Sequence, residues 1–227
     1  MKTETPETQA GTNMARRSFL KYAGMGAASV GLLAVASCHK DHMTNPSNGI
    51  DIGNGDIGIL NYAYALEQLE AAFYIKVIES QFTGITASET ALLTDIRDHE
   101  VAHREFFKNA LGNKAIPNLE VNFASINFSN RDSVLGTAKA FEDLGVSAYN
   151  GAGKLITSPD YLVLAGKIVS VEARHAAYIR DLISNGSFAD NTVIDMNGLD
   201  KSRLPAEVLM IAGTYIKTKI NASNLPS

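Results

Sequence analysis

Two Glu-x-x-His motifs constrain the fold of this 227-residue chain more than any other feature. On a helix, residues three apart face the same direction, so each motif aims one carboxylate and one imidazole at the same point. Both motifs lie in long stretches where apolar residues recur at helical spacing. The motifs are His99-Glu100-Val101-Ala102-His103 and Glu172-Ala173-Arg174-His175. Together they indicate two helices that contribute matching side chains to an interior site.

Four segments of the chain show the periodicity of amphipathic helices. Each carries one glutamate on its apolar face, where an unpaired charge is strongly disfavoured. Ser88 is the predicted cap of the second helix, which Gly112 ends, and residues 157–160 form the break before the fourth. The predicted helices span 57–80, 88–111, 130–155 and 159–184, and their inward glutamates are Glu67, Glu100, Glu142 and Glu172.

The segment 112–129 separates the second and third helices and breaks the helical pattern with Gly112, Pro117 and strand-like alternation. Its roughly 18 residues could extend past about 50 Å, whereas a helix of about 24 residues is only about 36 Å long. The segment can therefore cross the bundle, so that the third helix begins at the same end as the second. We predict an all-α, up-down four-helix bundle with a long crossover between helices 2 and 3, followed by a short C-terminal helix over 205–220.

The two halves of this predicted bundle repeat one pattern. Glu67 is followed seven residues later by Tyr74, Glu142 is followed seven residues later by Tyr149, and a Glu-x-x-His motif comes after each pair. Four buried carboxylates need compensation, which two divalent cations would supply. Each cation would receive one imidazole, one terminal carboxylate and a share of bridging carboxylates. Oxygen-rich ligation with imidazole and no thiolate favours iron or manganese over a structural zinc site.

This pattern resembles the ferritin-like superfamily of di-iron carboxylate proteins, in which two helices carry a glutamate and two carry Glu-x-x-His. The stretch Leu60–Tyr74 is also similar to secreted ferritin-like proteins related to plant desiccation proteins. The resemblance covers residues 57–184. It implies that Tyr74 and Tyr149 lie beside the site as supporting or redox-active residues. The metal ligands that it implies are Glu67, Glu100, His103, Glu142, Glu172 and His175.

The resemblance also implies the chemistry of the site. Two iron ions are the expected cofactors, with manganese as the alternative, and O₂ or peroxide is the expected oxidant. The candidate activities are oxidation of Fe(II) and consumption of peroxide in stress protection, and a manganese catalase-like activity belongs to the same superfamily. A homo-oligomer is compatible with this fold.

Three alternatives remain open at this point. Glu70 lies three residues after Glu67 and could replace it, although the tyrosine spacing favours Glu67 and leaves Glu70 as a supporting or solvent-facing residue. His99, Glu100 and His103 match the His-Glu-x-x-His motif of zinc metalloproteases, but that interpretation leaves the second half of the pattern unexplained. The third alternative is a non-catalytic ferritin-like bundle that binds metal or serves as a structural module.

The N-terminal residues resemble an export signal. Residues 15–21, Ala-Arg-Arg-Ser-Phe-Leu-Lys, are similar to the twin-arginine motif. The apolar run after it, Tyr22 to Ala36, holds 15 residues, fewer than the about 20 that span a membrane. It ends in Val35-Ala36-Ser37-Cys38, which is similar to a bacterial lipobox and makes Cys38 the predicted lipidation site. An ordinary cleaved signal peptide is the alternative.

These signals predict how the chain is divided. We expect a signal peptide over 1–37, a flexible linker over 38–56, the bundle over 57–184 and a C-terminal extension over 185–227. The exported protein would be a periplasmic or cell-surface lipoprotein anchored to a membrane.

Composition limits the partners further. The formal net charge is −4, and no basic run occurs outside the N-terminus, so nucleic acid is not an expected partner. Cys38 is the only cysteine, which excludes an intrachain disulfide and a cysteine-based metal site.

Overall fold

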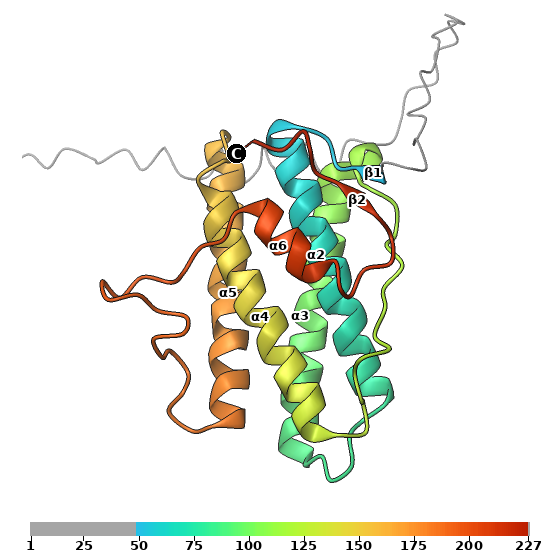
Figure 1. The fold of residues 1–227 in the computed structure, drawn as a ribbon, viewed down its shortest axis with the longest axis vertical. Coiled ribbons are helices and arrows are strands. Elements are labelled where there is room, and N and C mark those ends of the chain that lie inside the picture. Colours follow the sequence, from blue (N-terminus) through green and yellow to red (C-terminus); the bar gives the residue numbers. More distant parts are fainter. Residues whose placement is uncertain (1–48, 227) are drawn as a thin grey trace, which may run out of the picture. The chain divides into compact units, whose positions relative to one another are not determined.

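Four long helices form a bundle in the computed structural model, which describes residues 49–226 (Figure 1). The chain passes down α2, up α3, back along the bundle through an extended crossover, up α4 and down α5. The bounds are α2 (Gly55–Glu79), α3 (Ala87–Leu111), α4 (Arg131–Gly153) and α5 (Pro159–Ile183), and a 3₁₀ turn η1 (Gly112–Lys114) follows α3. The predicted all-α bundle with a long crossover is confirmed.

Side-chain caps determine where the helices begin. The Thr86 hydroxyl accepts a hydrogen bond from the Glu89 backbone N–H, while the Glu89 carboxylate accepts one from the Thr86 backbone N–H. This reciprocal capping box starts α3 at Ala87, so the prediction of Ser88 as the cap was wrong. Asn130 and Ser158 cap α4 and α5, each by accepting a hydrogen bond from a backbone N–H of the first turn.

α2 is buried on more sides than its predicted apolar stripe. Every residue from Gly58 to Ala71 is buried, including polar ones. Two of these polar side chains face the crossover: Asn61 Oδ1 accepts a hydrogen bond from the Ile116 N–H at 2.9 Å, and Gln68 Oε1 accepts one from the Leu119 N–H at 2.8 Å. α2 is therefore the central helix, and its polar residues hold the crossover in place.

The C-terminal helix is shorter than predicted. α6 spans Pro205–Ala212 instead of reaching residue 220. Beyond it, the Tyr215 carbonyl accepts a hydrogen bond from the Asn122 N–H, and the Lys217 N–H donates to the Glu120 carbonyl. The backbone after α6 satisfies its hydrogen bonds with the crossover, and the helix therefore ends there.

Residues 50–56, the last part of the predicted linker, belong to the folded unit. β1 (Ile50–Asp51) pairs in parallel with β2 (Ile220–Asn221), close to the start of α2 (Figure 1). The Ile52 side chain is fully buried in the core. The flexible linker over 38–56 thus ends earlier than expected, because its last residues find a partner strand near the C-terminus.

The predicted signal peptide over 1–37, the lipidation site Cys38 and the linker as far as residue 48 lie outside the described residues. Export by the twin-arginine route and anchoring at Cys38 therefore stay predictions. Within residues 49–226, no helix is both long enough and apolar enough to cross a membrane.

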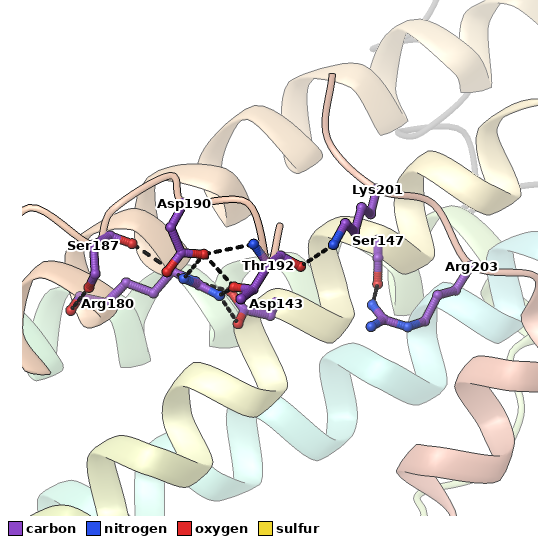
Figure 2. A network of polar contacts seen from close by, with 8 residues as sticks. All are labelled: Asp143, Ser147, Arg180, Ser187, Asp190, Thr192, Lys201 and Arg203. Atoms are coloured by element: carbon purple, nitrogen blue, oxygen red, sulfur yellow. Dashed lines mark hydrogen bonds and ion pairs between the residues drawn. The ribbon is translucent and has the colours of Figure 1, made fainter. Parts of the chain in front are cut away.

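Arg180 of α5 fastens the C-terminal extension to the bundle (Figure 2). Its guanidinium is buried and forms two hydrogen bonds with Asp143 of α4, Nε to Oδ1 at 2.8 Å and Nη2 to Oδ2 at 3.0 Å. The same guanidinium donates to the Thr192 hydroxyl at 2.6 Å. Further along the extension, Arg203 Nη1 donates to Ser147 Oγ at 2.6 Å. These charge-assisted bonds hold the irregular segment against α4 and α5.

Candidate metal centre

The bundle interior brings the six predicted ligands together. Their donor atoms form two groups of four, and within each group all donor atoms lie within 4.8 Å of one another. Glu100 and Glu172 belong to both groups. The first group adds Glu67 and His103, and the second adds Glu142 and His175. Each group could hold a metal ion, with Glu100 and Glu172 common to both and one further glutamate and one imidazole in each.

The four carboxylates are completely buried, and most of their oxygens have no hydrogen-bond partner. Glu67, Glu100, Glu142 and Glu172 have 0% exposure. Both oxygens of Glu100 and of Glu172 and one oxygen each of Glu67 and Glu142 are buried without a hydrogen bond. An orphaned buried carboxylate is strongly disfavoured in a protein interior. Cations at the two positions would satisfy these oxygens, so the donor set fits metal ions.

The imidazoles point their Nδ1 atoms into the same space. His103 Nδ1 lies 2.8 Å from Glu172 Oε1, and His175 Nδ1 lies 2.8 Å from Glu100 Oε1. Although these distances are short, neither Nδ1 makes a hydrogen bond, because the angles are unsuitable. Nitrogen and oxygen atoms that crowd without bonding each other are in the arrangement expected of ligands around a common ion.

Tyr74 and Tyr149 lie beside the centre and connect the two halves crosswise. The Tyr74 hydroxyl of α2 donates to Glu142 Oε1 of α4 at 2.5 Å. The Tyr149 hydroxyl of α4 donates to Glu67 Oε1 of α2. In both Glu67 and Glu142 the tyrosine binds Oε1, and Oε2 has no hydrogen bond. The tyrosines therefore fix the orientation of the two carboxylates that belong to only one group.

Burial and mutual repulsion shift the pKa values in this cluster. Burial, and then the charge of Glu172, raise the pKa of Glu67 and Glu100, and burial raises that of Glu142 to about 7. Burial acts in the same direction on Glu172, but the contacts with His103 and His175 outweigh it and lower its pKa.

The surrounding carboxylates also shift the pKa values of the two imidazoles. Burial lowers the pKa of His103 and of His175, but the surrounding carboxylates outweigh it and raise both values to about 12. In the absence of metal, the cluster therefore favours protons on its imidazoles, and Glu67, Glu100 and Glu142 bind protons more readily than exposed glutamates do. Cations would compete with these protons for the same donor atoms.

Glu70 is a fifth buried glutamate and belongs to neither group. Its Oε2 has no hydrogen-bond partner, and Oε1 faces Gly145, where an added Cβ would lie 3.0 Å away. Burial, then the charges of Glu172, Glu100 and the other cluster acids, raise its pKa well above the usual range. The structure thus places Glu67, not Glu70, among the converging groups, and the expectation of a solvent-facing Glu70 was wrong.

His99 is an exposed residue whose ring meets the centre from outside. Its Nδ1 lies 2.9 Å from His175 Nε2, and the two rings meet edge to edge, with centroids 5.2 Å apart and an interplanar angle of 8°. Burial, and then His175 and His103, lower the pKa of His99. The His-Glu-x-x-His motif drew attention to His99 but did not predict this contact. The sequence feature that could have drawn attention to this contact is a difference between the two motifs. A histidine, His99, precedes Glu100, whereas Val171 precedes Glu172.

The family model of the ferritin-like domain matches residues 55–185. The chain belongs to the ferritin-like domain family. The match begins with α2 and ends just after α5, so the ferritin-like domain contains all six predicted ligands and both tyrosines. β1, the C-terminal extension and α6 lie outside the match. No curated protein matches the chain.

Proposed function

We propose that this ferritin-like protein binds two iron ions and uses them in a redox reaction with O₂ or peroxide. The observation that supports the proposal is the convergence of two imidazoles and four fully buried carboxylates, most of whose oxygens have no hydrogen-bond partner. Carboxylates with imidazole and without thiolate suit iron, with manganese as the alternative. Bound iron would supply one-electron redox chemistry toward the oxidant.

In this proposal each group of the chain has a distinct part. Glu100 and Glu172 would serve both ions, while Glu67 with His103 and Glu142 with His175 would each serve one. Tyr149 and Tyr74 hold one oxygen of the two unshared glutamates, which keeps the other oxygen directed at its ion. Preorganised donors of this kind need little rearrangement when metal binds.

The burial of the site favours a small oxidant over an organic substrate. The four ligand glutamates are inaccessible, and His103, with 13% of its side chain exposed, is the most open of the six ligands. O₂ and peroxide are small enough to use such an opening. With Fe(II) as the substrate, two ions give one electron each, and peroxide takes these electrons with two protons to form two molecules of water.

We expect rapid Fe(II) oxidation when the anaerobic, Fe(II)-loaded protein is mixed with peroxide or O₂ in a stopped-flow absorbance experiment. About two Fe(II) per chain should react in the fast phase. Glu142→Ala should remove at least half of this phase, because it deletes an unshared ligand. Asp132→Asn, an exposed change on the same helix, should leave it intact.

A non-catalytic metal-binding bundle is the second candidate, and the crosswise hydrogen bonds favour it, because carboxylates held by tyrosines can stabilise the fold without turnover. Two bound ions that do not change on exposure to O₂ or peroxide would support this candidate over the redox proposal. The zinc protease interpretation requires His99 and His103 at one ion. His99 belongs to neither group of converging donors among residues 49–226 and instead contacts the outer nitrogen of His175.

A further inference from the structure

The two ring nitrogens of His175 have different neighbours. Nδ1 faces the carboxylates, lying 2.8 Å from Glu100 Oε1 and 3.5 Å from Glu142 Oε2. Nε2 faces outward and lies 2.9 Å from Nδ1 of His99, and the two rings meet edge to edge, with an angle of 8° between their planes. His99 is one of the few chemically active side chains around the centre that the proposed function leaves without a role.

The proton positions of this pair follow from the ligand role of His175. A histidine that binds a cation through Nδ1 uses the lone pair of that atom, so its proton must lie on Nε2. The Nε2–H of His175 then donates to Nδ1 of His99, which must present a lone pair. His99 therefore carries its own proton on Nε2. This contact selects the one tautomer of His175 that can bind a metal ion in the interior.

The second ligand histidine lacks such a partner. Among residues 49–226, no group makes a hydrogen bond with Nε2 of His103. By the repeat of the two motifs, the counterpart of His99 is Val171, whose side chain cannot accept a hydrogen bond. The two halves of the centre are thus matched in their ligands but not in what supports their imidazoles.

We propose that His99 is a positioning residue for His175. As a result, the metal position that includes Glu142 and His175 binds its ion more tightly than the position that includes Glu67 and His103. The inference rests on the proposed two-ion centre. Metal-binding histidines normally donate their second N–H to a fixed acceptor, and loss of that acceptor weakens metal binding about 10- to 100-fold. His99 supplies this acceptor on one side only.

Two substitutions of His99 distinguish the effect of its hydrogen-bond acceptor from the effect of its ring. His99→Asn places Oδ1 where His99 has Nδ1, because both atoms are bonded to Cγ, and so keeps an acceptor. His99→Phe keeps an aromatic ring at this position but has no acceptor. His99 is exposed, so neither substitution disturbs the core. Asp98→Asn, at the neighbouring exposed position, is the control.

The test is an anaerobic titration of the full chain with Co(II), a redox-stable probe, followed by its visible absorption. The wild type and Asp98→Asn should bind two ions in two resolved steps. In His99→Phe the tighter step should weaken about 10- to 100-fold while the weaker step stays within about twofold. His99→Asn should bind within about threefold of the wild type.

Two results would overturn the inference without affecting the two-ion centre. One is a His99→Phe protein with both wild-type binding constants. The other is a His99→Asn protein as weak as His99→Phe, which would show that the loss of the histidine ring, and not of the acceptor, matters. A wild-type chain that binds no Co(II) would instead contradict the proposed metal centre, and the inference with it. Thermal melting of each metal-free variant checks that the fold is intact.

Discussion

Replacing Glu100 with alanine is expected to abolish the tight binding of both metal ions. Glu100 belongs to both groups of converging donors, so its loss removes one ligand from each position. Glu67→Ala removes a ligand from one position only and should leave one ion bound. Metal analysis after gel filtration measures both results, and the rise in melting temperature on adding metal should disappear in Glu100→Ala.

The matched control for this experiment is Glu105→Ala. Glu105 lies on α3 two residues after His103, but its side chain is 44% exposed and pairs with Arg104. This variant should keep both ions and the metal-dependent rise in melting temperature. If Glu100→Ala retained one ion at wild-type affinity, Glu100 would not be a shared ligand, and the arrangement of the centre proposed here would be incorrect.

Replacing Glu70 with glutamine is expected to stabilise the metal-free protein, and increasingly so as the pH rises. Burial and the neighbouring acids raise the pKa of Glu70 in the folded state well above its usual range. When the pKa of a carboxyl group is higher in the folded than in the unfolded state, its contribution to the stability of the folded state is fully present below the unfolded-state pKa. This contribution is lost as the pH rises toward the folded-state pKa. Glutamine cannot ionise, so Glu70→Gln avoids this loss.

The difference in unfolding free energy between Glu70→Gln and the wild type should be smallest near the pKa of an exposed glutamate, about 4.3, and should grow steadily as the pH rises to about 8. Denaturant unfolding in the presence of a chelator measures it. Glu79→Gln removes the same charge from an exposed position of α2 and should show no such trend. A difference that does not change with pH, or a less stable variant at pH 8, would show that Glu70 carries no such penalty in the fold.

The features that the sequence could predict are local along the chain. Helical periodicity located α2 to α5, and the Glu-x-x-His spacing located two carboxylates and two imidazoles that the fold brings together. The resemblance to ferritin-like proteins implied that Tyr74 and Tyr149 lie beside the centre. It did not predict that each tyrosine binds the glutamate of the other half, because that depends on how α2 and α4 pack.

The features that sequence reasoning missed depend on contacts between distant residues. β1 forms only because β2 lies beside it, and the two strands come from opposite ends of the described chain. The end of α6 is set by hydrogen bonds with the crossover. The contact between His99 and His175 joins residues on two different helices. No periodic pattern along the chain reports on such pairs.

The buried acids of the candidate metal centre lower the stability of the metal-free protein. Glu67, Glu70, Glu100 and Glu142 all have raised pKa values, and burial is the largest cause in each case. A bundle without a metal-binding function would gain stability from apolar residues at these positions. The convergence of Glu67, Glu100 and Glu142 on the two imidazoles despite this cost is the physical argument for a metal ligand role.

The most direct test of this account is a crystal structure of the protein loaded with Mn(II) or Fe(II), with anomalous scattering used to locate the ions. The account predicts two anomalous peaks between the four helices. Glu100 and Glu172 should contact both, Glu67 and His103 one, and Glu142 and His175 the other. A single peak, or peaks outside this cluster, such as one held by His99 and His103, would contradict the two-ion centre.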